Sequence, residues 1–192
     1  MFDIKGQLIP QVEIKELKIT IPLPKKKYIQ RGGEIFIIAQ KILSGTAFEN
    51  EINIFYGYLS DVFKLPKKQL IKDYDIDTLI IALVRLFELA NETEGKYTLP
   101  YFPSEDSEEE GYSYEVYTGS DKLVADYAKL SIIEVNNLNY VDFLILRKDA
   151  YINKMSQTEK GRDYLEQCYC FESEKPDRAA LRKQFGGENN GK

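Results

Sequence analysis

The sequence of 192 residues contains no histidine and no tryptophan, and only two cysteines and two methionines. Histidine is the usual general base near neutral pH and the commonest metal ligand. Without it, the chain alone cannot form a Ser-His-Asp triad, a Cys-His pair or a histidine-ligated zinc or haem site. We therefore expect a protein that binds a partner and is not an enzyme, with no cofactor and no metal.

The two cysteines, Cys168 and Cys170, are separated by a single residue. A structural zinc site needs about four ligands, and the sequence offers no second cysteine pair. Side chains two positions apart on a helix point to different faces, which disfavours a disulfide between them. We expect two reduced thiols, which fits a cytosol better than a secreted compartment.

The chain is acidic, with a net charge of -5, and its hydrophobic content of 43% is sufficient for a folded core. Nucleic-acid binding without sequence preference needs a basic surface, so we expect no nucleic-acid partner. The N-terminus, Met1 to Pro10, does not have the pattern of a signal peptide. The most apolar stretch, Leu79 to Ala90, contains two charges and is too short to span a bilayer, so we expect no membrane partner.

The patterning predicts an α+β fold that is mainly α-helical, with a small N-terminal β element followed by a helical bundle. An acidic, proline-containing stretch then predicts a flexible linker to a second, all-helical module. The expected boundaries are 1–95 for the N-terminal module, 96–115 for the linker, 116–187 for the C-terminal module and 188–192 for a disordered tail.

The β element is predicted from an alternation of apolar and polar residues, and this alternation changes phase part-way along. Val12 and Ile14 alternate with polar residues, and Leu17, Ile19 and Ile21 alternate in the opposite phase. The change of phase indicates a bulge or a short break. Pro22 and Pro24 end regular pairing, and Lys25 to Gln30 is predicted to add a second short strand.

Helical spacing begins at Glu34 and continues to the end of the first module. One helix is predicted to end at Gly45, and Pro66 is placed to open a short one. A helix between them, Ala47 to Lys64, is predicted to bury the apolar residues Phe48, Ile52, Phe55, Leu59, Val62 and Phe63. Asp75 or Asp77 is predicted to cap a further helix. The spacing of these acids with Asp73 resembles a calcium loop, but the glycine and glutamate that such a loop requires are missing.

Three helices are predicted from Ser120 onward, and Pro176 is placed to open a last one, Asp177 to Phe185. This last helix brings Arg178, Arg182 and Lys183 close together, and these are the candidate partner-binding residues. A docking surface for an acidic partner and a solvated helix face both fit them. Apolar residues left uncovered on Ala47 to Lys64 are the second place where we expect a partner to bind.

Two regions of the sequence resemble phage proteins. Residues 54–63 (IFYGYLSDVF) and 70–79 (LIKDYDIDTL) resemble the N-terminal module of tail assembly chaperones of siphophages. Residues 147–153 (RKDAYIN), 157–165 (QTEKGRDYL) and 175–182 (KPDRAALR) look like small phage and prophage proteins encoded in tail gene clusters. Together these quoted stretches make up about a quarter of the chain.

The resemblance implies a non-catalytic chaperone of tail morphogenesis that coats the extended tape measure protein while tail tube protein assembles around it. Alternatives from other classes are a structural virion component, such as a head-tail connector or tail-completion protein, and an adaptor acting on a host factor. The oligomeric state is not determined by the sequence.

Overall fold

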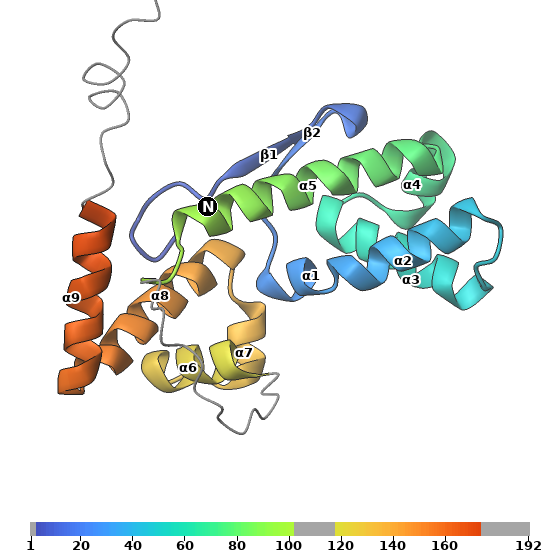
Figure 1. The fold of residues 1–192 in the computed structure, drawn as a ribbon. Helices are drawn as coiled ribbons and strands as arrows, with labels where there is room; N and C mark the ends of the chain where they lie inside the picture. Colours follow the sequence, from blue (N-terminus) through green and yellow to red (C-terminus); the bar gives the residue numbers. More distant parts are fainter. Residues whose placement is uncertain (1–2, 102–117, 174–192) are drawn as a thin grey trace, which may run out of the picture. The chain divides into compact units, whose positions relative to one another are not determined.

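The structure, a computed structural model, describes residues 3–101 and 118–173 (Figure 1). In this part of the chain, one short β-hairpin is followed by helices, which confirms the predicted, mainly helical α+β class. In chain order the elements are β1 Gln11–Ile14, a 3₁₀ turn Lys15–Leu17, β2 Ile19–Pro22, α1 Lys26–Gln30, α2 Gly32–Leu43, α3 Glu49–Phe63, α4 Lys67–Asp73, α5 Ile76–Lys96, α6 Gly119–Ala128, α7 Ile132–Asn137, α8 Tyr140–Ser156 and α9 Glu159–Ser173.

The chain divides into two compact units, one formed by residues 1–98 and 116–150 and the other by residues 99–115 and 151–192. The first unit therefore crosses the boundary that we expected at 96–115. Side-chain contacts over long sequence separations account for this: Lys26 binds Asp121, and the backbone nitrogen of Ile4 donates to Asp142 at 2.9 Å.

The N-terminal hairpin contains the predicted break. β1 and β2 pair antiparallel, with Val12 opposite Ile21 and Ile14 opposite Ile19. The 3₁₀ turn between them ends at Lys18 in the left-handed region, at φ 53°. The turn accounts for the change of phase, because it buries Leu17 between two strands whose own inward residues alternate.

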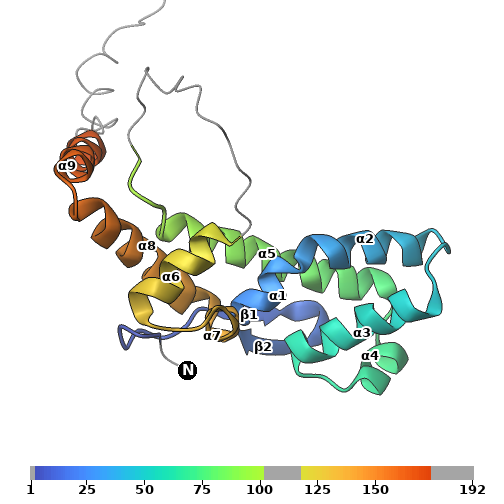
Figure 2. The ribbon, with the colours of Figure 1, turned by 90° about the horizontal axis from the view of Figure 1, so that it is seen from below.

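Helix α5 packs across β1 and the 3₁₀ turn. Helices α2 and α3 run antiparallel beside each other, and α2 also packs on α5 (Figure 2). The buried core between these elements includes Ile14, Leu17, Ile35, Phe55, Leu59, Leu79, Leu83 and Leu86.

The segment predicted as a second short strand, Lys25 to Gln30, is wrong as a strand, because Lys26–Gln30 forms α1. A turn of helix buries the side chain of Lys26, which is 1% exposed, and leaves Lys25 exposed. Strand-like pairing in this described segment is limited to an isolated bridge between Lys25 and Asn139.

The predicted helix from Ala47 to Lys64 corresponds to α3, and the predicted burial of Phe55, Leu59, Val62 and Phe63 is confirmed. The predicted burial of Phe48 is wrong, because its side chain is 72% exposed. Phe48 is the residue before the first helical one and has an extended backbone, at φ -79° and ψ 159°. Helical spacing therefore does not determine where its side chain points.

Helices α5 and α7 begin with side-chain caps. Asp75 accepts a hydrogen bond from the backbone nitrogen of Thr78 at 2.7 Å, which confirms the predicted start of α5. Helix α7 was not predicted from the sequence. Its cap is a reciprocal pair in which Ser131 Oγ accepts from the backbone nitrogen of Glu134, and the Glu134 carboxylate accepts from that of Ser131.

The described part of the second unit comprises residues 99–101, the end of α8 from Tyr151, and α9. Thr158 Oγ1 accepts from the backbone nitrogen of Gly161 at 3.0 Å and so caps α9. In α9, Cys168 is buried and Cys170 is exposed, and no disulfide joins them. None of the described helices combines the length and the apolar character that a membrane crossing requires.

The neighbouring glycines at the start of α2 provide a matched test of packing. A Cβ atom at Gly32 would lie 2.4 Å from the ring of Phe87, which packs against Phe36 with 5.4 Å between ring centroids. A Cβ atom at Gly33 would meet no atom within 4 Å.

We expect Gly32→Ala to lower the free energy of unfolding by roughly 1–3 kcal/mol, because the ring must move within a packed contact. Gly33→Ala should raise it by about 0.5–1 kcal/mol or leave it unchanged, because alanine favours a helix. Urea unfolding followed by circular dichroism measures both, and equal effects would contradict the packing argument.

Candidate protein-binding surface

The sequence pointed to two places for a partner, and the structure describes one of them. Arg178, Arg182 and Lys183 lie outside the described residues. On the Ala47 to Lys64 segment, two large apolar side chains are left uncovered: Phe48 at 72% exposure and Ile54 at 39%.

Helix α2 has more apolar side chains than its own unit covers. Ile35, Ile38 and Ala39 face the core, whereas Ile37 is 58% exposed and Leu43 is 52% exposed. A helix with apolar side chains around most of its circumference is normally buried by other parts of a protein on most of its sides. We name the exposed residues Ile37, Leu43, Phe48 and Ile54 the α2–α3 patch.

An ion pair between α2 and α3 shows which residues of the two helices lie opposite each other. Lys41 Nζ lies 2.5 Å from Glu51 Oε1. Ile37 is one turn before Lys41, and Ile54 is one turn after Glu51. Because the helices are antiparallel, both steps lead away from the connecting turn, and Ile37 and Ile54 come to the same level on the outer side of the pair.

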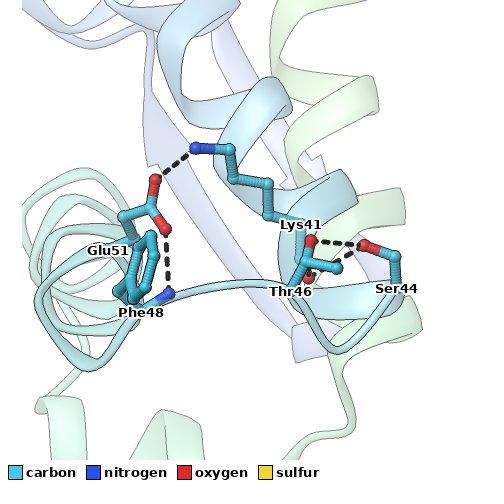
Figure 3. A network of polar contacts seen from close by, with 5 residues as sticks. All are labelled: Lys41, Ser44, Thr46, Phe48 and Glu51. Carbon is cyan, nitrogen blue, oxygen red and sulfur yellow. Dashed lines mark hydrogen bonds and ion pairs between the residues drawn. The ribbon is translucent and has the colours of Figure 1, made fainter.

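The turn between the two helices is held by polar contacts (Figure 3). The Glu51 carboxylate accepts from the backbone nitrogen of Phe48 at 2.9 Å and also binds Lys41. Ser44 Oγ and Thr46 Oγ1 are 2.8 Å apart, and both contact the carbonyl oxygen of Lys41. These contacts reach only the backbone nitrogen of Phe48 (Figure 3), and its side chain is 72% exposed.

Two ion pairs lie beside the patch, Arg31–Glu34 and Lys41–Glu51. Arg31 makes two hydrogen bonds to Glu34, at 3.0 and 3.3 Å. The side-chain bond from Arg31 lowers the pKa of Glu34, and the bonds from Lys41 and then the Phe48 backbone lower the pKa of Glu51. The four residues of the patch are uncharged, and these two ion pairs beside it are formed within the chain.

A different group of residues joins α1 to the later helices. Lys26 Nζ donates to Asp121 Oδ2 at 2.9 Å and to Asn136 Oδ1 at 2.8 Å. It also lies 4.7 Å from the centroid of the Phe143 ring. All these partners lie in the first unit, and the side chain is 1% exposed. This is a buried and paired lysine, whose role is to join helices.

A second polar group links α5 to α8. Tyr140 Oη donates to Glu94 Oε2 at 2.7 Å, and Arg147 Nη1 lies 2.9 Å from Glu94 Oε1. Burial by itself would raise the pKa of Glu94, but the bonds from Tyr140 and Arg147 outweigh it and lower the pKa. Burial, and next the bond to Glu94, raises the pKa of Tyr140.

These two groups border a pocket of about 360 Å³ in the first unit. Its wall includes Lys26, Asp121, Tyr140 and Arg147. Each of these side chains already has a hydrogen-bond or ion-pair partner within the unit. These contacts join α1 to α6 and α5 to α8 within the unit.

In the described ranges, no group of three or more Cys, Asp or Glu side chains is placed to hold a metal ion. In comparisons with known proteins, no family model, no curated protein and no solved structure matches the chain.

Sequence reasoning missed the exposed residues of α2, although a signal was present. The five consecutive residues Ile35 to Ala39 are all apolar, and Ile42 and Leu43 follow. A helix that buries one face needs apolar residues only every three or four positions. An apolar run of this kind indicates that a second face of the helix must also be buried, for example by a binding partner.

Proposed function

We propose that this protein is a tail assembly chaperone of a phage that binds the tape measure protein without catalysing a reaction. The single structural observation that carries the proposal is the α2–α3 patch, with Phe48 72% and Ile37 58% exposed. The resemblance of residues 54–63 and 70–79 to siphophage tail assembly chaperones supplies the client.

The chemistry of the patch fits such a client. Clustered exposed apolar side chains mark sites of protein binding, and aromatic side chains contribute most of the affinity at many such sites. An extended client presents many apolar segments of different sequence, so its chaperone benefits from a surface without charge selectivity. The patch itself consists of uncharged residues, and the nearby Arg31 and Lys41 are paired with Glu34 and Glu51.

Co-expression with the tape measure protein from the same genome tests the proposal. We expect the full chain to keep the tape measure protein soluble and to co-purify with it. Expression of the tape measure protein alone is the control. A client that remains insoluble, together with no co-purification, would contradict the proposal.

Mass spectrometry of purified virions separates the proposal from its nearest alternative. A chaperone is absent from finished particles. A head-tail connector or tail-completion protein is present at a fixed number of copies.

A further inference from the structure

The outward side of α5 has a second surface, which shares no residue with the α2–α3 patch. Leu79, Leu83 and Leu86 are buried on the inner side of this helix. Along the outer side, residues recur at alternating steps of four and three: Asp77, Ile81, Val84, Glu88 and Asn91. We name this row the α5 seam.

The seam has the spacing by which two helices pack side by side. Alternating steps of three and four keep one row of side chains facing a neighbouring helix. Ile81 is 48% exposed and Val84 is 39% exposed, and they occupy the middle of the row. From Asp77 to Asn91 the seam spans about 21 Å, enough for roughly four turns of a partner helix.

Acidic residues lie on both sides of the apolar centre of the seam. Asp77 and Glu88 flank the apolar centre, and Glu92 lies beside the far end. Arg85 is neutralised mainly by Glu16, whose Oε1 lies 2.8 Å from Arg85 Nε. Glu16 and Glu88 both raise the pKa of Arg85, and the effect of Glu88, which makes no hydrogen bond to Arg85, is the smaller. Within the described part of the chain, Asp77, Glu88 and Glu92 form no ion pair, so the outer side of α5 has an excess of negative charge.

We propose that the α5 seam binds an amphipathic helix of a protein partner whose apolar centre is flanked by lysine or arginine. The apolar residues of that helix contact Ile81 and Val84, and its basic residues face Asp77 and Glu88. This pattern combines exposed apolar area with complementary charge, which selects one kind of helix over others.

A second copy of the chain does not fit the same surface. Antiparallel pairing of two seams would place Asp77 opposite Glu88, and parallel pairing would place each acid opposite itself. Both arrangements oppose like charges across a helix pair, which is unfavourable. The occupant is therefore a different, basic helix.

A labelled synthetic peptide of about 18 residues, long enough to form a helix when bound, tests the proposal. The peptide carries leucine at the two positions that would face Ile81 and Val84, and lysine at the positions that would face Asp77 and Glu88. Its matched control carries glutamate in place of each lysine. Fluorescence anisotropy with the full chain should show binding of the lysine peptide at least about tenfold tighter than that of the glutamate peptide. Binding of the lysine peptide should weaken as salt is raised.

Variants of the chain test whether the peptide binds at the α5 seam. Ile81→Gln with Val84→Gln should weaken lysine-peptide binding at least about tenfold, whereas Ile71→Gln on α4, a similarly exposed apolar position, should not. Asp77→Lys with Glu88→Lys should reverse the preference, so that the glutamate peptide binds tighter.

Equal binding of the two peptides, no binding at concentrations of about 200 µM, or binding that is insensitive to salt would overturn the proposal. These three measurements use the unaltered chain and do not depend on whether a variant folds. They also do not involve the tape measure protein, so failure of this proposal and failure of the proposed chaperone function are distinguishable.

Discussion

Replacing Lys26 by alanine should lower the free energy of unfolding by roughly 3–5 kcal/mol, the cost of removing one partner from a buried ion pair. Lys26 is 1% exposed and Asp121 is 13% exposed. The substitution leaves the Asp121 carboxylate without its counter-ion, Asn136 without a donor at 2.8 Å and one face of Phe143 uncovered. These three losses act at the junction of α1 with α6, α7 and α8.

Lys25→Ala is the matched control, because Lys25 is adjacent in sequence but exposed. We expect it to change the free energy of unfolding by less than about 0.5 kcal/mol. Urea unfolding can be followed by circular dichroism and by tyrosine fluorescence, since the chain has 14 Tyr and no Trp. Equal effects of the two substitutions would show that the buried pair does not stabilise the unit.

A double-mutant cycle measures how much of the destabilisation by Lys26→Ala comes from the ion pair with Asp121. If Lys26 acts through Asp121, the effect of Lys26→Ala should be reduced when Asp121 is already asparagine, with a coupling energy of about 1–3 kcal/mol. Additive effects would mean that the methylene packing of Lys26 and its contact with the Phe143 ring account for the loss.

Combining Phe48→Asp with Ile37→Glu should weaken binding to the tape measure protein at least about 100-fold, equivalent to roughly 2.7 kcal/mol. The two substitutions place negative charges in the middle of an apolar contact. Binding can be measured by co-purification with the client and by the fraction of client that remains soluble. This prediction rests on the proposed function.

The double variant is designed to remain folded. Position 48 is the N-cap of α3, where aspartate is favoured. A glutamate at position 37 lies four residues before Lys41, which stabilises a helix. Ile133→Glu on α7 is the control, because Ile133 is 74% exposed and lies outside the patch. A double variant that is folded and still binds the client as the unaltered chain does would reject the patch as the binding surface.

Much of the fold could be predicted from local patterns. The spacing of apolar residues predicted the helices that became α2, α3 and α5. Asp75 or Asp77 was predicted as a cap, because a short acidic side chain satisfies backbone nitrogens at a helix start, and Asp75 is the one that caps α5. The change of phase between Ile14 and Leu17 predicted the break that the 3₁₀ turn occupies.

Local patterns failed where the structure depends on distant residues. The run Lys25 to Gln30 was predicted as a strand, but the partners of Lys26 lie 95 and 110 positions along the chain. The start of the C-terminal module at residue 116 was predicted from the composition of the linker. Composition does not report that residues 118–150 and the N-terminal elements belong to one compact unit.

The sequence by itself determined that the chain folds as a mainly helical protein, because side-chain periodicity and helix caps are local properties. It also determined the absence of histidine, from which we expected binding and not catalysis. Only the tertiary structure decided that Lys26 is buried while Ile37, Phe48 and Ile81 are exposed. The physical reason is that periodicity identifies an apolar face of a helix, whereas the packing of other elements decides whether that face is covered.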